Sequence, residues 1–416
     1  MTRIAMISYH TCPLATLGGK DTGGMNVYVR DLTRFLGQIG IHVDVFTRSQ
    51  DEHVPHVLHD LGYGNRVVHI PAGPEVPLQK EQLASYIPDF VAGIRKFSQE
   101  KNIHYDLIHS HYWMSGMAAL SLKEAWSVPI VQMFHTLGVM KNSVAQNPGE
   151  IEGDYRLNGE KKVIAGVDRI TAATLSEKEQ LVSLYHADER KINVISPGVD
   201  ISRFYPIPKD EARAFVGTPP DEQMILFVGR IEPLKGVEVL MRAISLMRKK
   251  GVACEIPHYL AIIGGEPDSD EKRVSAEMAR LKLLCGELDL CEMAVFLGKR
   301  SQDILPYYYS AADLLVMPSL YESFGLVALE SMACGTPVVA SKVGGLAYLV
   351  RDGVNGYTVS DGDIDALSAQ ITALLRHPQH RENLGRQAIQ FAQDYSWEKI
   401  ASRIADLYGN LISTSD

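Results

Sequence analysis

The stretch that decides the fold is ISPGVDISRFYPIP, residues 195–208, where three prolines interrupt a regular alternation of strand and helix patterns. The same alternation restarts at Met224–Val228. Proline neither continues a helix nor donates to a sheet, so prolines gathered between two such series mark a domain boundary. We therefore expect two domains, residues 1–200 and 201–395. Residues 397–411 have the apolar spacing of a helix, so we expect segment 396–416 to be a helix that can pack back across the domains.

Each series predicts a parallel, doubly wound sheet, which makes the chain an α/β protein with two Rossmann-like halves. The strands expected in the first half are 3–8, 43–47, 67–70, 107–109, 130–133, 169–172 and 193–195. Those expected in the second half are 224–228, 259–263, 294–297, 314–317, 337–340 and 356–359. Ligands of such sheets lie beyond the carboxyl ends of the strands, so we look for chemistry in the loops that leave them.

Length and composition agree with two globular domains. At 416 residues the chain exceeds the limit of about 250–300 residues at which single cores stop growing. A hydrophobic share of 46% and a charged share of 22% allow large cores and disfavour long disordered arms. The net charge of -9 disfavours nucleic acid as a partner, although a local basic patch can still hold a small phosphorylated ligand.

The cysteines and the N-terminus indicate a cytoplasmic protein. Five scattered cysteines form neither a disulfide framework nor a zinc site. The start, MTRIAMISYH, is too short and too soon polar for a signal peptide, and no run of about 18 apolar residues predicts a transmembrane segment. The sequence leaves open whether the chain forms a homodimer.

A glycine-rich segment, GGKDTGGMN at residues 18–26, lies between the first expected strand and a helical pattern. Glycines let a backbone approach a ligand, and a helix start offers free N–H groups to an anion. The alternative is an ordinary flexible turn. The spacing fits neither the Walker lysine motif nor the usual dinucleotide fingerprint.

A second turn, VGRIEPLKG at residues 228–236, follows the first strand of the second half. Arg230 and Lys235 stand five residues apart on it, so both can reach a diphosphate and neutralise its charge as it departs. The alternative is a solvated surface pair. The turn residues Gly229, Pro233 and Gly236 favour the functional interpretation.

A third segment, PSLYESFGLVALE at residues 318–330, passes from a buried strand through a loop into a helix. Glu322 on the loop and Glu330 in the helix can accept sugar or ribose hydroxyls, while N–H groups near Phe324 and Gly325 can face phosphate. Glu330 alone could equally satisfy a neighbouring backbone. We expect the turns at 335–337 and 344–346 to close the floor of the same pocket.

Basic and hydroxyl groups also gather in the first half. They are His10, Lys80, His109, His111, Tyr112, His135, Thr136, Lys141 and Arg156. Histidines at strand ends can donate to a hydroxyl or phosphate, and the lysines and arginine can supply positive charge for an anionic acceptor. Each histidine taken alone could be structural. A metal at His109 and His111 is disfavoured because no carboxylate or cysteine has ligand spacing nearby.

With these motifs the chain resembles the retaining glycosyltransferases of family four, over nearly its whole length. The Gly-Arg-x(4)-Lys-Gly turn and the Glu-x(7)-Glu segment carry that resemblance, which implies a GT-B fold of two domains facing across a cleft. Within the family, GGMNVYVRDL, LIHSHYWMSG and HTLGVMKNS look most like the D-inositol-3-phosphate glycosyltransferases that begin mycothiol synthesis. The resemblance implies a hexosyltransferase with a nucleotide diphosphate sugar as co-substrate and no required cofactor or metal.

The resemblance also implies roles for particular residues. It implies that the acceptor is bound by His10, Asp21, Thr22, Asn26, Lys80, Tyr112, Thr136 and Arg156, of which Lys80, Tyr112, Thr136 and Arg156 take its phosphate. It implies that the donor is bound by Gly23, Gly24, Arg230, Lys235, Arg300, Glu322, Ser323, Phe324, Gly325 and Glu330. Arg300 would lie at the base, Glu330 at the ribose and Glu322 at the transferred sugar, which His135 orients. The catalytic set is then His135, Arg230, Lys235 and Glu322.

Substrate identity stays open between alternatives. We expect a UDP-linked donor carrying GlcNAc or glucose, and an acceptor such as inositol 3-phosphate. Sucrose-phosphate synthases are similar over the same loops and take fructose 6-phosphate, although Met25 and Asn26 favour the inositol enzymes. A non-catalytic nucleotide-sugar sensor is the alternative outside enzymes, and turnover of labelled donor separates it from a transferase.

Overall fold

The computed structural model describes residues 2–15, 22–145, 148–265 and 276–414. They form two compact units, which we describe separately. The first contains the N-terminal residues, Thr22–Gly198 and the C-terminal residues from Trp397, and the second is Val199–Ser396.

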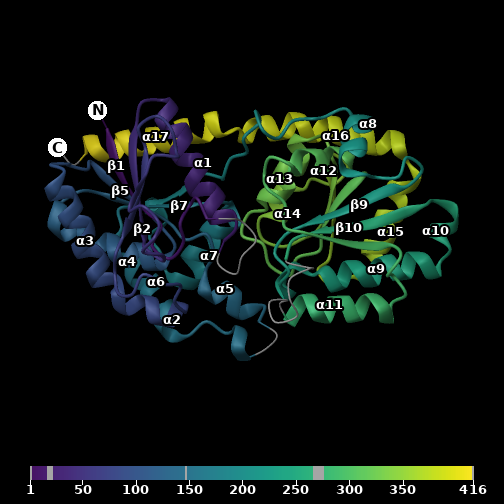
Figure 1. Cartoon of the computed structure of the whole chain (residues 1–416), viewed down its shortest axis with the longest axis horizontal. Coiled ribbons are helices and arrows are strands. Elements are labelled where there is room, and N and C mark those ends of the chain that lie inside the picture. Colours follow the sequence, from purple (N-terminus) through teal and green to yellow (C-terminus); the bar gives the residue numbers. More distant parts are fainter. Residues whose placement is uncertain (1, 16–21, 146–147, 266–275, 415–416) are drawn as a thin grey trace. The chain divides into compact units, whose positions relative to one another are not determined.

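The sheet of the first unit has the strand order β3-β4-β2-β1-β5-β6-β7-β8. Figure 1 labels β1, β2, β5 and β7 of this sheet. Its strands are β1 (Arg3–Ile7), β2 (His42–Arg48), β3 (Val57–Leu58), β4 (Arg66–Ile70), β5 (Leu107–His111), β6 (Ile130–Met133), β7 (Arg169–Ala172) and β8 (Ile192–Val194). Neighbours pair in parallel except β3, which is antiparallel to β4. The expectation of a wholly parallel sheet was wrong at β3, because a strand of two residues carries no readable alternation.

The sheet of the second unit has the order β11-β10-β9-β12-β13-β14, all parallel. Its strands are β9 (Gln223–Val228), β10 (His258–Ile263), β11 (Ala294–Gly298), β12 (Leu314–Met317), β13 (Val338–Ser341) and β14 (Gly356–Val359). This is the Rossmann order, in which the chain starts at the centre, builds one side and returns to build the other.

Helices cover these sheets. In the first unit they are α1 (Gly24–Gln38), α2 (Lys80–Leu83), α3 (Ile87–Glu100), α4 (Trp113–Trp126), α5 (Gly138–Ser143), α6 (Asp154–Gly166), α7 (Leu175–Tyr185) and α17 (Trp397–Ser413), with 3-10 turns η1 (Ala84–Tyr86), η2 (Pro148–Glu150) and η3 (Glu189–Lys191). In the second they are α8 (Lys209–Val216), α9 (Val237–Lys249), α10 (Val252–Glu255), α11 (Ala276–Glu287), α12 (Leu305–Ala311), α13 (Leu326–Ala333), α14 (Leu346–Leu349), α15 (Ile364–Arg376) and α16 (Pro378–Ala392), with η4 (Pro233–Lys235) and η5 (Gln393–Tyr395).

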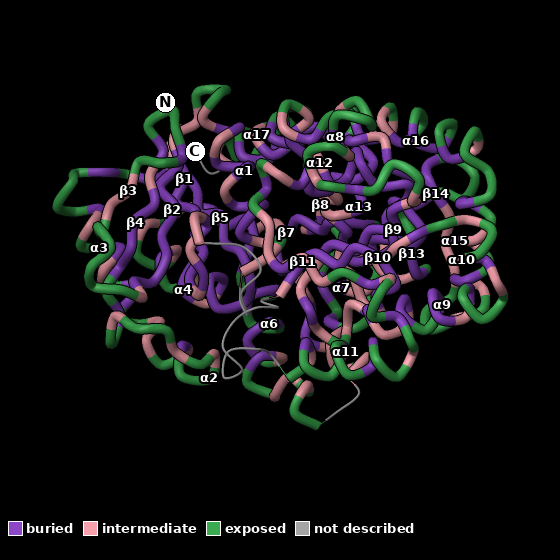
Figure 2. Tube along the Cα trace, turned by 45° about the vertical axis from the view of Figure 1, so that its right-hand side comes forward, coloured by how far each residue is buried: buried purple, intermediate pink, exposed green. Residues whose placement is uncertain are grey.

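The helices bury one face each, as their sequences predict. On α9, Val237, Leu240, Met241 and Ile244 recur at the spacing of one helix face and are all buried. Each unit has its own apolar core under such faces. Figure 2 shows the strands buried within the units, and exposed residues on the outer sides of the helices.

The C-terminal helix α17 packs on α1 within the first unit. Trp397, at its start, is fully buried, and its ring lies 5.3 Å from that of Tyr28. Further along, the hydroxyl of Tyr408 lies 2.6 Å from Nδ1 of His109 on β5. The helical spacing expected for residues 397–411 is confirmed.

The side on which the chain adds new strands changes between β1 and β5 in the first sheet, and between β9 and β12 in the second. At such a switch point the loops leaving the two central strands diverge and leave space for a ligand. The motifs at 228–236 and 318–330 follow β9 and β12, and His10 and Tyr112 follow β1 and β5, so the topology places these residues at the two switch points. No helix in the described ranges is long and apolar enough to cross a membrane.

Candidate active site

In the second unit, the turn after β9 lies directly on the loop that leaves β12. Gly236 has a φ of +69°, and a Cβ on it would stand 1.9 Å from the carbonyl oxygen of Pro318. Leu320 N–H donates to the carbonyl of Leu234 at 2.9 Å. Only glycine permits both the left-handed backbone and this close approach, so Gly236 sets the distance between the two loops.

Because these loops touch, Lys235 and Glu322 form an ion pair. Nζ of Lys235 lies 2.5 Å from Oε2 of Glu322, and their side chains are 20% and 14% exposed. Arg230, on the same turn, pairs with Glu232 at 2.8 Å and is more exposed, at 38%. The predicted donor-binding cations therefore share one turn, and one of them is held against the carboxylate expected to meet the sugar.

The loop from Glu322 to Gly325 is fixed by a second glycine turn. A Cβ on Gly344 would stand 2.0 Å from the carbonyl oxygen of Glu322, and one on Gly345 would stand 2.2 Å from Cα of Phe324. Gly325, with a φ of +106°, begins helix α13. Ser323, Phe324 and Gly325 are thus held at a helix start, where free N–H groups favour an anion.

The turn at residues 335–337 does not belong to this pocket, so that expectation was wrong. It joins the end of α13 to the start of β13. In a parallel sheet, a helix that starts at the carboxyl edge of the strands returns the chain to their amino edge. The turn therefore lies at the opposite edge, and only the turn at 344–346 contacts the loop.

Glu330 and Arg300 lie among polar side chains of the same unit. Glu330 is 6% exposed, and its Oε2 accepts a hydrogen bond from the Tyr309 hydroxyl at 2.7 Å. Arg300 follows β11, and its Nε donates to the Tyr308 hydroxyl at 3.1 Å. The structure thus shows protein partners for both, and their roles at the ribose and the base stay predictions.

In the first unit, the residues at the start of α1 have different surroundings. Gly24 is exposed, whereas Asn26 is 1% exposed. Nδ2 of Asn26 donates to Thr11 Oγ1 and to the Cys12 carbonyl, both at 2.7 Å, and its Oδ1 accepts from Gly23 N–H. Asn26 therefore joins the loop after β1 to the helix start. Thr22 adjoins this segment, and Asp21 lies outside the described residues.

Histidines from neighbouring strands form a buried cluster. Nδ1 of His111 lies 3.1 Å from Nε2 of His135, and the rings of His109 and His111 are 4.3 Å apart. The ring centre of His10, after β1, lies 4.6 Å from that of Tyr112, with the two rings tilted. Burial lowers the pKa of His109 and of His135 to about 3, so both imidazoles are neutral at pH 7.

This cluster should make the first unit sensitive to acid. Between pH 3 and 6.5 the unfolded chain binds a proton at His109 that the folded chain does not, so stability is full above pH 6.5 and falls as pH drops. His109→Gln is expected to flatten that dependence by up to about 1.4 kcal/mol per pH unit. Urea unfolding can be followed by tryptophan fluorescence at pH 4–7, because Trp113, Trp126 and Trp397 all lie in the first unit.

The exposed His104 in the same unit provides the control, as His104→Gln should keep the wild-type slope. Equal slopes for His109→Gln and the wild type would show that burial of His109 does not oppose its protonation.

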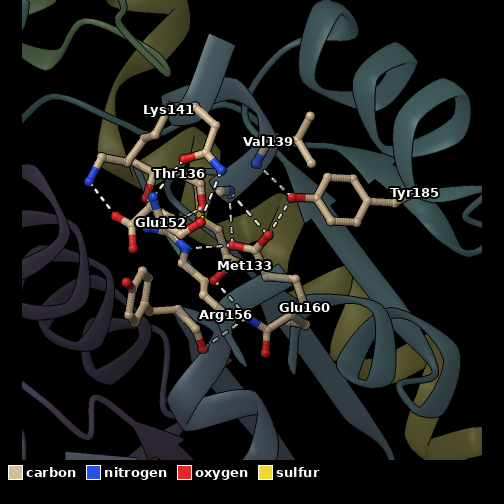
Figure 3. Close-up of polar contacts among 12 residues, drawn as sticks. Met133, Thr136, Val139, Lys141, Glu152, Arg156, Glu160 and Tyr185 are labelled. Carbon is tan, nitrogen blue, oxygen red and sulfur yellow. Dashed lines mark hydrogen bonds and ion pairs between the residues drawn. The ribbon is translucent and has the colours of Figure 1, made fainter. Parts of the chain in front are cut away.

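Arg156, in the first turn of α6, is the centre of a cluster of charged and polar side chains, which we call the basic pocket (Figure 3). The guanidinium is 1% exposed and stacks 4.9 Å from the Tyr112 ring centre, over which Nζ of Lys80 lies at 6.0 Å. Nη2 of Arg156 donates to both the carbonyl and Oγ1 of Thr136 at 3.0 Å. The structure thus brings together the four residues expected to hold the acceptor phosphate.

Two carboxylates that the sequence analysis missed complete the pocket. Nε of Arg156 donates to Glu160 at 2.8 Å, and Nη1 donates to Glu152 at 2.6 Å. Glu152 also pairs with Lys141. The signal was present in the sequence, because Glu152 and Glu160 stand four residues before and after Arg156, the spacing of helical ion pairs.

These neighbours keep the pocket charged. Burial alone would lower the pKa of Arg156, but Tyr112, Glu160 and Glu152 hold it above its ordinary value. Burial raises the pKa of Tyr112 to about 12 against the opposing effect of Arg156, so its hydroxyl stays protonated. Among the described residues no three His, Cys, Asp or Glu side chains are grouped to hold a metal ion.

The chain combines two Rossmann-like sheets with charged loops near their switch points, and comparisons with known proteins show its class of enzyme. A model described as Glycosyltransferase Family 4 matches residues 22–203, and one described as Glycosyl transferases group 1 matches residues 208–391. The chain belongs to this family of GT-B glycosyltransferases, as its motifs indicated, and is a hexosyltransferase.

Individual relatives are similar over nearly the whole chain. A D-inositol 3-phosphate glycosyltransferase 2 of Catenulispora acidiphila is 40% identical, over 99% of this chain and 95% of that one. A D-inositol 3-phosphate glycosyltransferase of Mycobacterium marinum is 38% identical, over 99% and 86%. The solved sucrose-phosphate synthase of Thermosynechococcus elongatus is 34% identical, covers both chains fully and has a TM-score of 0.90.

Proposed function

We propose that the chain transfers a sugar, with retention of configuration, from a UDP-sugar to a phosphorylated polyol, with D-inositol 3-phosphate as the first candidate. The observation that carries this proposal is the basic pocket of Arg156, Lys80, Tyr112 and Thr136. A guanidinium and an ammonium with two hydroxyls match the charge and the acceptor oxygens of a phosphate. The names of the relatives at about 40% identity support the same acceptor.

On the donor side, we assign the diphosphate to Arg230 and Lys235. Both lie on the turn after β9, and Gly236 brings that turn against the loop holding Glu322. Positive charge there stabilises the diphosphate as the glycosidic bond breaks, which lowers the barrier because the charge develops in the transition state. Glu322 and the N–H groups near Phe324 then face the sugar and the phosphates.

For retention, a diphosphate oxygen takes the proton of the acceptor hydroxyl on the face from which that hydroxyl attacks. No protein base is then required. Burial lowers the pKa of His135 to about 3, so its neutral ring is a weak base that does not compete for that proton but can still donate a hydrogen bond to the sugar. Donor groups lie mainly in the second unit and acceptor groups in the first, so turnover requires both.

The test is a screen of UDP, GDP and ADP sugars against inositol 3-phosphate, fructose 6-phosphate and unphosphorylated inositol, read by product mass. We expect UDP-GlcNAc or UDP-glucose with inositol 3-phosphate to give product, and proton NMR of the anomeric centre to show retention. Donor binding without transfer to any acceptor would favour the sensor, and inversion would refute the mechanism.

A metal-independent reaction is part of the proposal, and chelation tests it. Three Asp-x-Asp triplets are present, at 268–270, 361–363 and 363–365, and the first lies outside the described residues. Asp363 in the second caps α15 by accepting from Ala366 N–H at 2.9 Å. We expect full turnover in EDTA. Loss of turnover that Mg²⁺ or Mn²⁺ restores would contradict the assignment of the cationic role to Arg230 and Lys235.

Fructose 6-phosphate is the second candidate acceptor. The sucrose-phosphate synthase of T. elongatus supports it, at 34% identity over the full length. Both acceptors carry a phosphate for the same pocket, so the pocket does not separate them. In the screen, a higher kcat/KM with fructose 6-phosphate than with inositol 3-phosphate would select this candidate.

A further inference from the structure

The basic pocket of the first unit already contains an anion, the carboxylate of Glu152. Its Oε1 accepts from Nη1 of Arg156 at 2.6 Å and also from Nζ of Lys141 (Figure 3). Lys80 adds positive charge close to the same carboxylate. Three cations from three helices, α2, α5 and α6, therefore act on one carboxylate.

The second carboxylate of the pocket is bound quite differently. Glu160 is fully buried, and its oxygens accept from Arg156, from Gly138 N–H at 3.0 and 3.1 Å, and from the Tyr185 hydroxyl. Such a carboxylate cannot leave without exposing several unpaired donors. Glu160 is therefore the permanent counter-ion that fixes the Arg156 side chain.

Glu152 is arranged so that its side chain can move while its backbone stays. The residue lies in the segment before α6, and its side chain is 14% exposed. Its N–H donates to Asn142 Oδ1 at 2.7 Å, and its carbonyl accepts from Asn142 Nδ2 at 3.0 Å. Among the described residues, its carboxylate bonds to two cations, Arg156 and Lys141, and to no backbone group.

We propose that Glu152 is a built-in competitor for the acceptor phosphate: its carboxylate occupies the basic pocket of the free enzyme and is displaced when the phosphate binds. The inference rests on the proposed function, since it takes the Arg156 pocket as the acceptor phosphate site. A phosphate dianion carries more charge and more acceptor oxygens than the carboxylate, so it displaces Glu152, whereas a weaker anion does not. Glu152 thereby sets the affinity of the site and selects against weak anions.

Two consequences follow for the free enzyme. Glu152 keeps the buried cations paired, which avoids the penalty of neighbouring unpaired charges. Burial raises the pKa of Glu152, but the charges of Arg156 and Lys141 lower it by more. The pKa therefore lies below its ordinary value, and the carboxylate is charged at neutral pH. The competitor is therefore present when the acceptor phosphate is a dianion.

The decisive variant is Glu152→Gln, with inorganic phosphate as the probe. Calorimetric titration of the full chain should show phosphate binding about 10-fold tighter than in the wild type, since no charged group has to be displaced. The KM for the phosphorylated acceptor should fall in parallel, with little change for unphosphorylated inositol. Sulfate, another dianion with acceptor oxygens, should gain affinity too.

Two further variants keep the inference testable. Asp154→Asn removes the same charge from an exposed residue two positions away and should leave phosphate affinity unchanged. Glu152→Asp keeps the charge but shortens the side chain by one methylene, so this variant should fold even if Glu152→Gln does not. Its gain in phosphate affinity should be smaller than that of Glu152→Gln. Unchanged or weaker phosphate binding in the Glu152 variants would overturn the inference and would show that Glu152 only orders Arg156.

The same measurements separate this inference from the proposed function. Tighter phosphate binding in Glu152→Gln, without transfer to any phosphorylated acceptor, would support the competitor and refute the proposed acceptor. Transfer that requires a phosphorylated acceptor, with phosphate affinity unaltered in the variant, would support the proposed function and refute the competitor.

Discussion

Replacement of Lys235 by methionine is expected to lower kcat by a factor of about 100 to 1,000, the usual loss when one transition-state donor is removed. Nζ of Lys235 lies 2.5 Å from Oε2 of Glu322, and the neighbouring Gly236 allows their two loops to approach closely. Methionine keeps most of the side-chain volume and removes the charge. Because the diphosphate gains charge only as the bond breaks, the loss should appear mainly in kcat.

The matched control is Lys209→Met in the same unit. Lys209 also pairs with a carboxylate, Asp313 at 2.7 Å, which sits before β12 at the opposite edge of the sheet. That variant should keep wild-type turnover. The double variant Lys235→Met/Glu322→Gln addresses a different explanation, that Lys235 merely neutralises Glu322. Recovery of turnover above that of Lys235→Met would support that explanation and refute direct action on the diphosphate.

Replacement of Arg156 by alanine should affect stability and acceptor choice together. Glu160 is fully buried and would lose its cation, so we expect about 3–5 kcal/mol of destabilisation, the usual result of breaking a buried ion pair. Tryptophan fluorescence during urea unfolding reports it, since all three tryptophans lie in the first unit. The KM for the phosphorylated acceptor should rise about 10- to 100-fold, from the loss of charge-assisted bonds.

The control for stability alone is Arg66→Ala. Arg66 makes a bidentate pair with Asp44 in the same unit, with both distances 2.7 Å, away from the basic pocket. It should lower stability without changing the preference for a phosphorylated acceptor. Arg156→Lys keeps the charge but loses the planar fork, so it should remain folded and still bind the acceptor poorly. An equal loss for phosphorylated and unphosphorylated acceptors would contradict the phosphate assignment.

Much of the fold could be predicted because its signal is local. The β-branched runs at 130–133, 169–172, 314–317 and 356–359 coincide with β6, β7, β12 and β14 to the residue. Strands buried on both faces are continuous apolar runs, and the parallel order follows from the helices between them. The two-residue strand β3 was not predicted because it forms only through pairing with β4.

The candidate site was predictable in its parts but not in its contacts. Arg230 and Lys235 stood out because two cations five residues apart on one turn can both reach a diphosphate, and Glu322 because it lies on a loop that follows a buried strand. Their pairing was not visible, because Lys235 and Glu322 are 87 residues apart and meet only where β9 adjoins β12. The turn at 335–337 was misplaced for the same reason, since closeness in sequence to Glu330 says nothing about the edge of the sheet.

The sequence by itself determined the class of protein, since strand–helix periodicity and the spacing of charged residues in two loops are local patterns that can be recognised without the structure. Only the tertiary structure decided what those charges face. It placed Glu152 in the basic pocket, between Arg156 and Lys141, and made Glu160 a fixed counter-ion. The physical reason is that periodicity reports burial, whereas electrostatic partners depend on distances that arise only when the strands and helices pack together.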